Sequence, residues 1–233
     1  MECLIFMQHP FYLTALALTF IFSFVLGVFT ILLNPKSRTH QLWFLTTMGV
    51  ALWSGALFAF VFLNSNEKLG IFLAQILHIG STLIVIFFYN FLAVFLLKWR
   101  EYKISVILCD IFSLIFLVII IFMPQIFVKG IIPRAGFAKW IDYGSFYWPY
   151  FFYYIIFVLL SARILLKEFF KSDGIRKKQI LYILLALVIG FSGGLTNFFP
   201  ALFNIYPFGT FVIFLYPILI TYGMFLPQVK IKF

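Results

Sequence analysis

Residues 86–123 read IFFYNFLAVFLLKWREYKISVILCDIFSLIFLVIIIFM, in which two long apolar runs meet at a short basic junction. A helix needs about 20 mostly apolar residues to cross the roughly 30 Å hydrocarbon core of a bilayer. The run after the junction has this length, and the run before it continues upstream to residue 71. The stretch therefore predicts two antiparallel membrane-spanning helices joined by a tight basic turn.

The rest of the chain repeats this pattern. Hydrophobic residues make up 64% of the 233 residues and mean hydropathy is +1.12, so a water-soluble fold would expose large apolar patches. Seven stretches are long enough to span a bilayer, near residues 11–33, 41–63, 71–97, 104–123, 146–166, 179–197 and 207–226. We predict an all-α fold in which residues 1–233 form one polytopic seven-helix transmembrane bundle, and the intervals leave no room for a soluble output domain.

Basic residues alternate between the two sides of this bundle. With the N-terminus outside, 13 of the 17 Lys and Arg residues fall in cytoplasmic segments, and the opposite orientation reverses this ratio. Because Lys and Arg are retained in cytoplasmic loops, we predict an external N-terminus and a cytoplasmic C-terminus. The predicted cytoplasmic residues are Lys36, Arg38, Lys98, Arg100, Lys103, Arg163, Lys167, Lys171, Arg176, Lys177, Lys178, Lys230 and Lys232.

The net charge of +10 is spread over loops that flank the membrane, so we expect the lipid bilayer as a partner and no nucleic acid. Cys3 and Cys109 fall at opposite faces of the bilayer, which excludes a disulfide between them. The chain has only three histidines, and His78 has no Cys or carboxylate nearby in sequence, so we expect no metal site, and no motif requires a cofactor.

Two connections between spans stand out by composition. Residues 124–145 mix turn formers with aromatic residues, which is typical of a small lid lying on the outer surface. Residues 167–178 combine chain breakers with a basic run. Its residues Arg176, Lys177 and Lys178 are the candidate cytoplasmic contact for a partner or for lipid, and a plain solvated loop is the alternative.

Polar residues inside spans are energetically costly. At 1.5 Å rise per residue, Asn90 and Asp110 lie about 10–12 Å inside the cytoplasmic boundary on neighbouring spans. We therefore expect them to meet as an interhelical polar pair, with a structural role favoured over proton sensing. His78, near the outer face, has two open interpretations: a packing residue, which is the commoner case, or a ligand-binding or pH-sensing group.

The sixth span carries Gly190 and Gly194 four residues apart, a spacing that permits close helix packing. This span ends in GGLTNFFP at residues 193–200, and the seventh opens with IYPFG at residues 205–209. Proline is tolerated in the first turn of a helix, so Pro207 fits the start of the seventh span.

These two runs, together with HIG at 78–80, FVKG at 127–130 and RKKQI at 176–180, resemble the N-terminal seven-helix membrane region of bacterial sensor histidine kinases and related signalling proteins. The resemblance implies a sensory module in the bacterial cytoplasmic (inner) membrane that passes a stimulus to a cytoplasmic output partner such as a kinase or cyclase. It also implies a possible homodimer. The chain has no phosphoacceptor-histidine, ATP-binding or cyclase motif, so we expect it to have no enzyme activity. It is then either a stand-alone receptor or part of a longer kinase.

If the chain is a sensor, its unknown small ligand is expected in the outer half of the bundle. The candidate sensing residues are His78, Thr196, Asn197, Asn204, Tyr206 and Trp148, with Trp140 and Tyr147 of the lid region beside them. The alternative is that these polar groups cap helix ends. Other functions remain open: a small transporter or lipid-handling protein, for which no internal repeat is evident, or a structural membrane subunit; a membrane enzyme has no supporting motif.

Overall fold

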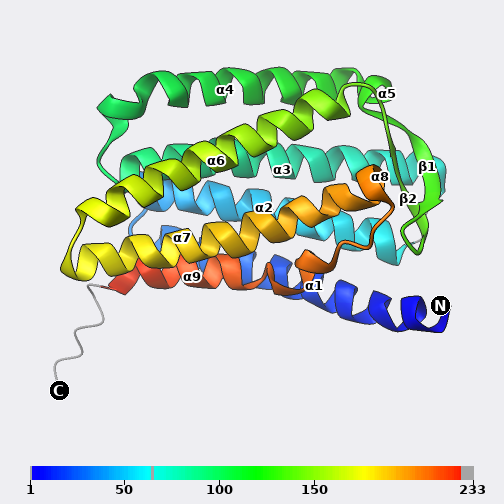
Figure 1. Cartoon of the computed structure of the whole chain (residues 1–233), viewed down its shortest axis with the longest axis horizontal. Coiled ribbons are helices and arrows are strands. Elements are labelled where there is room, and N and C mark those ends of the chain that lie inside the picture. The colour runs from blue at the N-terminus through cyan, green and yellow to red at the C-terminus, as the bar shows by residue number, and fades with distance from the viewer. Residues whose placement is uncertain (1, 64–65, 227–233) are drawn as a thin grey trace.

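The computed structural model describes residues 2–63 and 66–226, and the predicted cytoplasmic Lys230 and Lys232 lie outside them. Six long helices pack side by side along one direction (Figure 1). All six are long and apolar enough to cross a bilayer. They are α1 (Glu2–Leu33), α2 (Arg38–Phe62), α3 (Glu67–Phe95), α4 (Trp99–Phe122), α6 (Tyr147–Lys171) and α7 (Gly174–Leu195).

The seventh apolar segment is interrupted. It consists of a 3₁₀ helix, η2 (Phe208–Val212), followed by the short α9 (Leu215–Phe225), instead of one helix over residues 207–226. Pro217 supplies a physical reason, because proline fits only the first turn of an α-helix, and it is the third residue of α9. The described part of the chain thus has six candidate spans plus a shorter helix, consistent with a seven-helix membrane bundle.

The sixth span also runs further than expected. After α7 the chain continues through the 3₁₀ helix η1 (Thr196–Phe198) and α8 (Phe199–Phe203) before it turns. Asn204 ends this path in the left-handed conformation, at φ 55°. Asn is one of the few non-glycine residues that adopt this conformation readily.

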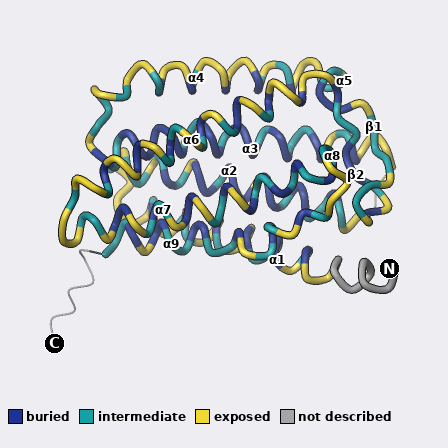
Figure 2. The backbone as a smooth tube through the Cα atoms, in the orientation of Figure 1, coloured by how far each residue is buried: buried dark blue, intermediate teal, exposed yellow. Residues whose placement is uncertain are grey.

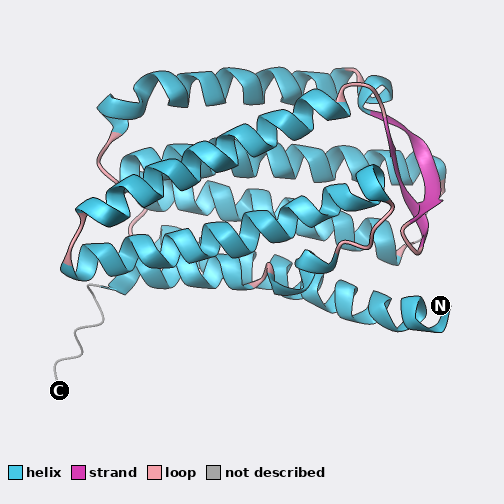
Figure 3. Ribbon diagram, viewed as in Figure 1, coloured by secondary structure: helices cyan, strands magenta, loops and turns pink. Residues whose placement is uncertain are grey.

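The connection between α4 and α6 contains a β-hairpin, which the all-α prediction lacked. After the short α5 (Pro124–Phe127), strand β1 (Val128–Arg134) pairs antiparallel with β2 (Phe137–Tyr143). Ala135 and Gly136 form the two-residue turn, both with positive φ, as hairpins with a primed turn require. The hairpin lies across one end of the bundle (Figure 3). Trp140 and Phe137 are almost completely buried there, so the hairpin covers this end of the bundle.

The two ends of the molecule differ in composition. The hairpin, the turn after α8 and the start of α1 lie at one end, and the short α1–α2, α3–α4 and α6–α7 junctions lie at the other (Figure 1). The predicted cytoplasmic residues of the described chain cluster at or near these three junctions. Which end faces the cytoplasm rests on this charge distribution and stays a prediction.

The outer surface of the bundle is apolar. Figure 2 shows exposed residues along the outer side of α4 and buried ones between the helices. Exposed side chains on α4 include Ile104, Leu114 and Val118. Water-soluble monomers rarely expose apolar surface of this extent, whereas a lipid-facing helix requires it. The chain is an integral membrane protein.

Glycine contacts differ from the expected ones. An added Cβ at Gly190 would collide with the ring of Tyr216, and one at Gly194 would lie 3.0 Å from the Tyr154 hydroxyl, so both glycines face side chains instead of a helix backbone. The close backbone approach involves Gly193, whose added Cβ would lie 2.6 Å from the carbonyl oxygen of Gly209. Gly80 makes a second such approach, with its added Cβ 2.6 Å from the backbone nitrogen of Trp53.

Candidate sensing cavity

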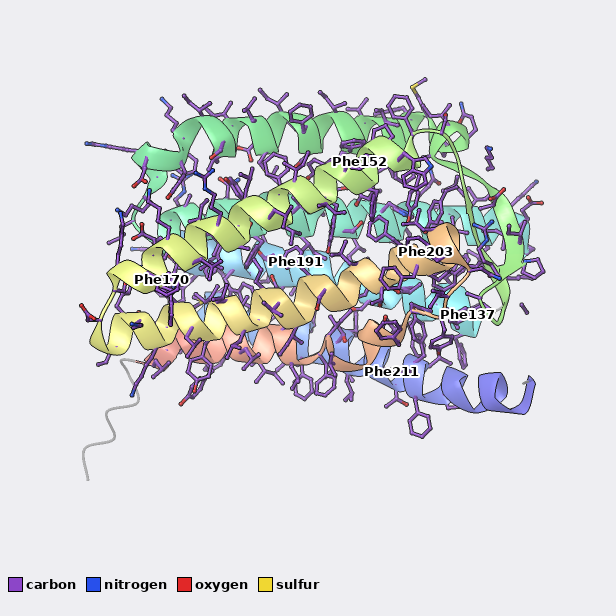
Figure 4. The ribbon with its side chains drawn as sticks, in the orientation of Figure 1. Phe137, Phe152, Phe170, Phe191, Phe203 and Phe211 are labelled. Atoms are coloured by element: carbon purple, nitrogen blue, oxygen red, sulfur yellow. The ribbon has the colours of Figure 1, made fainter. Side chains whose placement is uncertain are left out.

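A cavity of about 60 Å³ lies inside the bundle, bordered by α2, α3, α6, α7, α9 and the end of β2. Its walls are mostly aromatic. Phe191 of α7 borders it in the interior of the bundle, whereas Phe137 lies at the hairpin end (Figure 4). The lining residues that carry polar groups are His78, Ser81, Asn197 and a set of tyrosines: Tyr143, Tyr147, Tyr150, Tyr154 and Tyr216.

His78 is positioned by its own helix. Its Nδ1 lies 2.6 Å from the carbonyl oxygen of Ala74, one turn earlier in α3. A carbonyl oxygen only accepts, so Nδ1 carries the proton and a neutral ring presents Nε2 as an acceptor. The ring meets Phe127, Tyr143, Tyr147 and Tyr150 edge-on, with centroid distances from 4.8 to 6.1 Å. His78 is therefore packed in an aromatic surround that leaves one nitrogen available.

Hydroxyl groups connect α3 to α6 beside this ring. The Ser81 and Tyr150 hydroxyls are 2.5 Å apart, and Thr82 Oγ1 lies 3.3 Å from the same tyrosine hydroxyl. Ser81 and Thr82 also donate to the carbonyl of His78, at 3.1 and 2.8 Å. The tyrosine is thereby held in place by two side chains that are anchored to their own helix.

Asn197 joins three parts of the chain. Tyr12 of α1 donates to Asn197 Oδ1 at 2.8 Å, and Asn197 Nδ2 donates to Thr210 Oγ1 in η2 at 3.1 Å. The neighbouring Thr196 Oγ1 accepts from the backbone N–H of Gly209 at 3.0 Å. The GGLTNFFP and IYPFG runs thus meet in space, and their polar side chains tie the end of α7 to α1 and to the start of the seventh segment.

Tyr216 is a lining residue that the sequence did not single out. Only 2% of the residue is exposed, and its hydroxyl has no hydrogen-bond partner among residues 2–63 and 66–226. A buried hydroxyl left unpaired costs about 1–3 kcal/mol. A tyrosine in an apolar run carries no sequence signal for this role, because its partners come from other helices: Trp43, Phe88 and Phe191.

The structure brings some of the predicted sensing residues together. His78, Asn197 and Tyr147 line the cavity. Thr196 is buried next to them, but its hydroxyl is committed to the backbone of Gly193 and Gly209.

The other predicted sensing residues lie elsewhere. Asn204 Oδ1 accepts from the backbone of Ala135, at the tip of the hairpin. Tyr206 stacks on Phe137 with centroids 5.2 Å apart, and burial raises the pKa of its hydroxyl, which therefore stays protonated at neutral pH. Trp140 is part of strand β2 in the hairpin, and its side chain is buried.

Trp148 points away from the cavity and is 51% exposed. The helix period explains this placement. Tyr147, Tyr150 and Tyr154 share one face of α6 at spacings of three and seven residues, and Trp148 is rotated about 100° from Tyr147. The prediction that Trp148 shares a cavity with the other sensing residues is therefore wrong.

The predicted polar pair is in contact. Asn90 Nδ2 donates to Asp110 Oδ1 at 2.7 Å and also to the carbonyl oxygen of Ile86 at 3.0 Å. The pair joins α3 to α4 some distance from the cavity. Its contribution to signalling stays a hypothesis, whereas its geometry is that of an interhelical brace.

The basic run at the start of α7 is less available than expected. Arg176 donates to the carbonyl oxygen of Phe95 at 2.6 Å and to Gln179 at 3.2 Å, and its guanidinium lies 4.4 Å from the centroid of the Phe95 ring. Lys177 stacks over Phe169 at 5.0 Å. Arg176 therefore holds α7 against the end of α3, and Lys178 is the exposed member of the run.

Comparison with known proteins agrees with this architecture. A search of curated proteins found no match. A family model described as the N-terminal 7TM region of histidine kinase matches residues 15–226, which include every helix that lines the cavity. The match covers almost the whole chain and concerns the membrane region of these kinases, not their catalytic part. The chain belongs to the family of N-terminal 7TM regions of histidine kinases.

Proposed function

We propose that this chain is a sensory input module of the bacterial cytoplasmic membrane, and that a small polar ligand binds in the central cavity. The proposal is carried by the buried hydroxyl of Tyr216, a residue that lines the cavity, because this hydroxyl has no partner within the described residues. A ligand that pairs with this hydroxyl removes its desolvation penalty of about 1–3 kcal/mol.

The chemistry of the lining narrows the ligand class. His78 Nε2 accepts, the tyrosine hydroxyls donate or accept, and aromatic rings form much of the wall. A compact molecule with both donor and acceptor groups fits this combination. The cavity of about 60 Å³ is smaller than the ~150 Å³ cavity that holds benzene in another protein, so anything larger than a few heavy atoms requires the helices to separate.

Transmission follows from the position of Tyr216. It lies on α9, and its ring fills the space that Gly190 leaves on α7. A ligand held by Tyr216 changes the packing of α9 on α7, and α9 leads toward the end of the bundle with the basic junctions. The ligand biases two helix arrangements only if its affinity for them differs. The signal is received by a cytoplasmic kinase or a related output protein, which is either part of the same polypeptide or a separate chain. The sensory module acts as a homodimer.

Binding is tested by thermal unfolding of the chain in lipid nanodiscs against a panel of small polar compounds, comprising amino acids, sugars and short organic acids. A compound at 100 times its Kd stabilises the protein by about 2.7 kcal/mol. We expect such a compound to stabilise the wild type and Tyr222→Phe, and to have a much weaker effect on Tyr216→Phe. Tyr222 is the matched control, since it lies on the same helix and is 47% exposed. Equal responses of the two variants would contradict the cavity as the binding site.

Signal output is tested separately. The chain is fused after its last residue to the dimerisation and ATP-binding core of a histidine kinase and placed in proteoliposomes. Autophosphorylation is then measured with and without the stabilising compound. A change in the wild-type fusion that is absent from Tyr216→Phe supports transmission, whereas binding without any change in phosphorylation would refute the sensory role.

A further inference from the structure

A second cavity, independent of the sensing cavity, lies at the opposite end of the bundle. It has a volume of about 240 Å³ and is bordered by Tyr89 of α3, Tyr102 and Ser105 of α4, and Arg163 and Lys167 of α6. It is four times larger than the central cavity. It lies where α4 and α6 diverge toward the end with the basic junctions (Figure 1).

The charges around this cavity do not balance. Lys167 donates to Glu101 at 2.6 Å, and Lys98 lies 3.4 Å from Glu101 and 3.7 Å from Glu168. Two carboxylates thus accompany two lysines. Arg163 is left over: its exposed side chain has no hydrogen bond, ion pair or ring contact with any residue that the structure describes.

Arg163 lies deeper along α6 than the paired Lys167, so its lack of an anionic partner among the described residues needs an explanation. It lies one helical turn, about 6 Å, further from the end of α6 than Lys167. An arginine at this depth is costly unless it snorkels toward the headgroups or meets an anion. Nearby on α4 and α6, the apolar side chains of Ile104, Leu108 and Leu159 are exposed, as lipid-facing residues are.

We propose that this cavity binds the phosphate headgroup of an anionic phospholipid. The planar guanidinium of Arg163 donates two parallel hydrogen bonds to phosphate oxygens, a geometry that phosphate favours. Lys167 Nζ and the Tyr102 hydroxyl, which lie 3.4 Å apart, border the same cavity and supply further donors. The acyl chains run along the exposed apolar surface of α4 and α6. Basic pockets between membrane helices bind anionic headgroups in this manner.

The test is native mass spectrometry of the full chain in detergent, titrated with phosphatidylglycerol or phosphatidylcholine. The wild type is expected to bind phosphatidylglycerol about tenfold more tightly, the size expected for one charge-assisted interaction. Arg163→Gln removes this preference, and Arg163→Lys keeps part of it. Arg100→Gln is the matched control because Arg100 is exposed near the same end of α4 but does not border the cavity.

Two further experiments distinguish a lipid headgroup from a soluble phosphate ion and control for misfolding of the variants. Inorganic phosphate added at constant ionic strength leaves lipid binding unchanged if the lipid is the ligand, and displacement by phosphate would instead assign a soluble anion. Tyr102→Phe, which removes a donor without changing charge, lowers the preference by a smaller factor. Equal losses in Arg163→Gln and Arg100→Gln, or equal affinity for both lipids, would overturn the proposal.

Discussion

Two buried tyrosines of the cavity differ in the hydrogen bonding of their hydroxyl groups. Tyr150 shares its hydroxyl with Ser81 and Thr82, whereas the Tyr216 hydroxyl has no such partner among the described residues. Both side chains are almost fully buried. A position that is kept polar at a cost in stability is typical of functional sites.

Replacing each tyrosine by phenylalanine is therefore expected to give opposite results in the ligand-free protein. Tyr216→Phe raises the free energy of unfolding by about 1 kcal/mol because it removes an unpaired buried hydroxyl. Tyr150→Phe lowers it by a similar amount because it removes the hydrogen bond between Tyr150 and Ser81. Unfolding in detergent, monitored by circular dichroism, measures both. A destabilised Tyr216→Phe variant would indicate that water or another group already satisfies the hydroxyl.

Asn197 supports a second prediction. Asn197→Ala removes its hydrogen bonds to Tyr12 and Thr210 and is expected to lower stability by about 1–2 kcal/mol. Tyr12→Phe removes only one of these bonds and costs less. The double variant isolates the coupling between the two side chains, which we expect to be about 0.5–1 kcal/mol. Additive effects of the two substitutions would show that the Tyr12 to Asn197 bond contributes nothing.

The helices use two different means of packing. The α2–α3 pair relies on close backbone approach at Gly80 and Gly49, where an added Cβ would lie 2.6 Å from Trp53 N and 3.1 Å from Ile84 N. Polar contacts help to attach helix α4, among them the Asn90–Asp110 bond of 2.7 Å. Membrane helices gain no hydrophobic driving force from each other, so small residues and hydrogen bonds replace it.

This difference predicts which glycines tolerate a methyl group. Gly80→Ala places Cβ against the backbone of Trp53, which can shift only together with the rest of α2. We therefore expect the free energy of unfolding to fall by about 1–3 kcal/mol. Gly55→Ala, on the facing helix α2, meets only the ring of Phe20, which can rotate, and is expected to change stability by less than about 1 kcal/mol. Thermal unfolding of the two variants checks this, and equal losses would exclude the backbone contact as the cause.

The whole molecule is a bundle with two chemically distinct ends. One end is closed by the hairpin, with the turn after α8 beside it, and the other carries the short basic junctions (Figure 1). The central cavity and the proposed lipid site lie toward opposite ends and use different residues. A stimulus acting on one site need not act on the other.

Orientation in the membrane can be measured directly. In a background with Cys3→Ser and Cys109→Ser, Lys129→Cys in the hairpin is expected to react with a membrane-impermeant maleimide in intact cells. Lys178→Cys, in the first turns of α7, is expected to react only after lysis. Both lysines are exposed, so burial does not account for a difference. The reverse pattern would invert the topology argued from the positive charges.

The amino-acid sequence by itself determined the class of this protein. The thickness of the bilayer sets the number of apolar residues that a spanning helix needs, so the apolar runs identify a helical membrane bundle. The rise per residue of a helix is enough to place Asn90 and Asp110 at the same depth. The tertiary structure decided everything that depends on how each helix is rotated and how segments meet. It turned Trp148 outward, brought Tyr216 to the cavity beside Asn197, and formed the hairpin around Ala135 and Gly136. The physical reason is that lipid-facing and interior residues are equally apolar in a membrane, so hydrophobicity carries little information about which face of a helix turns inward.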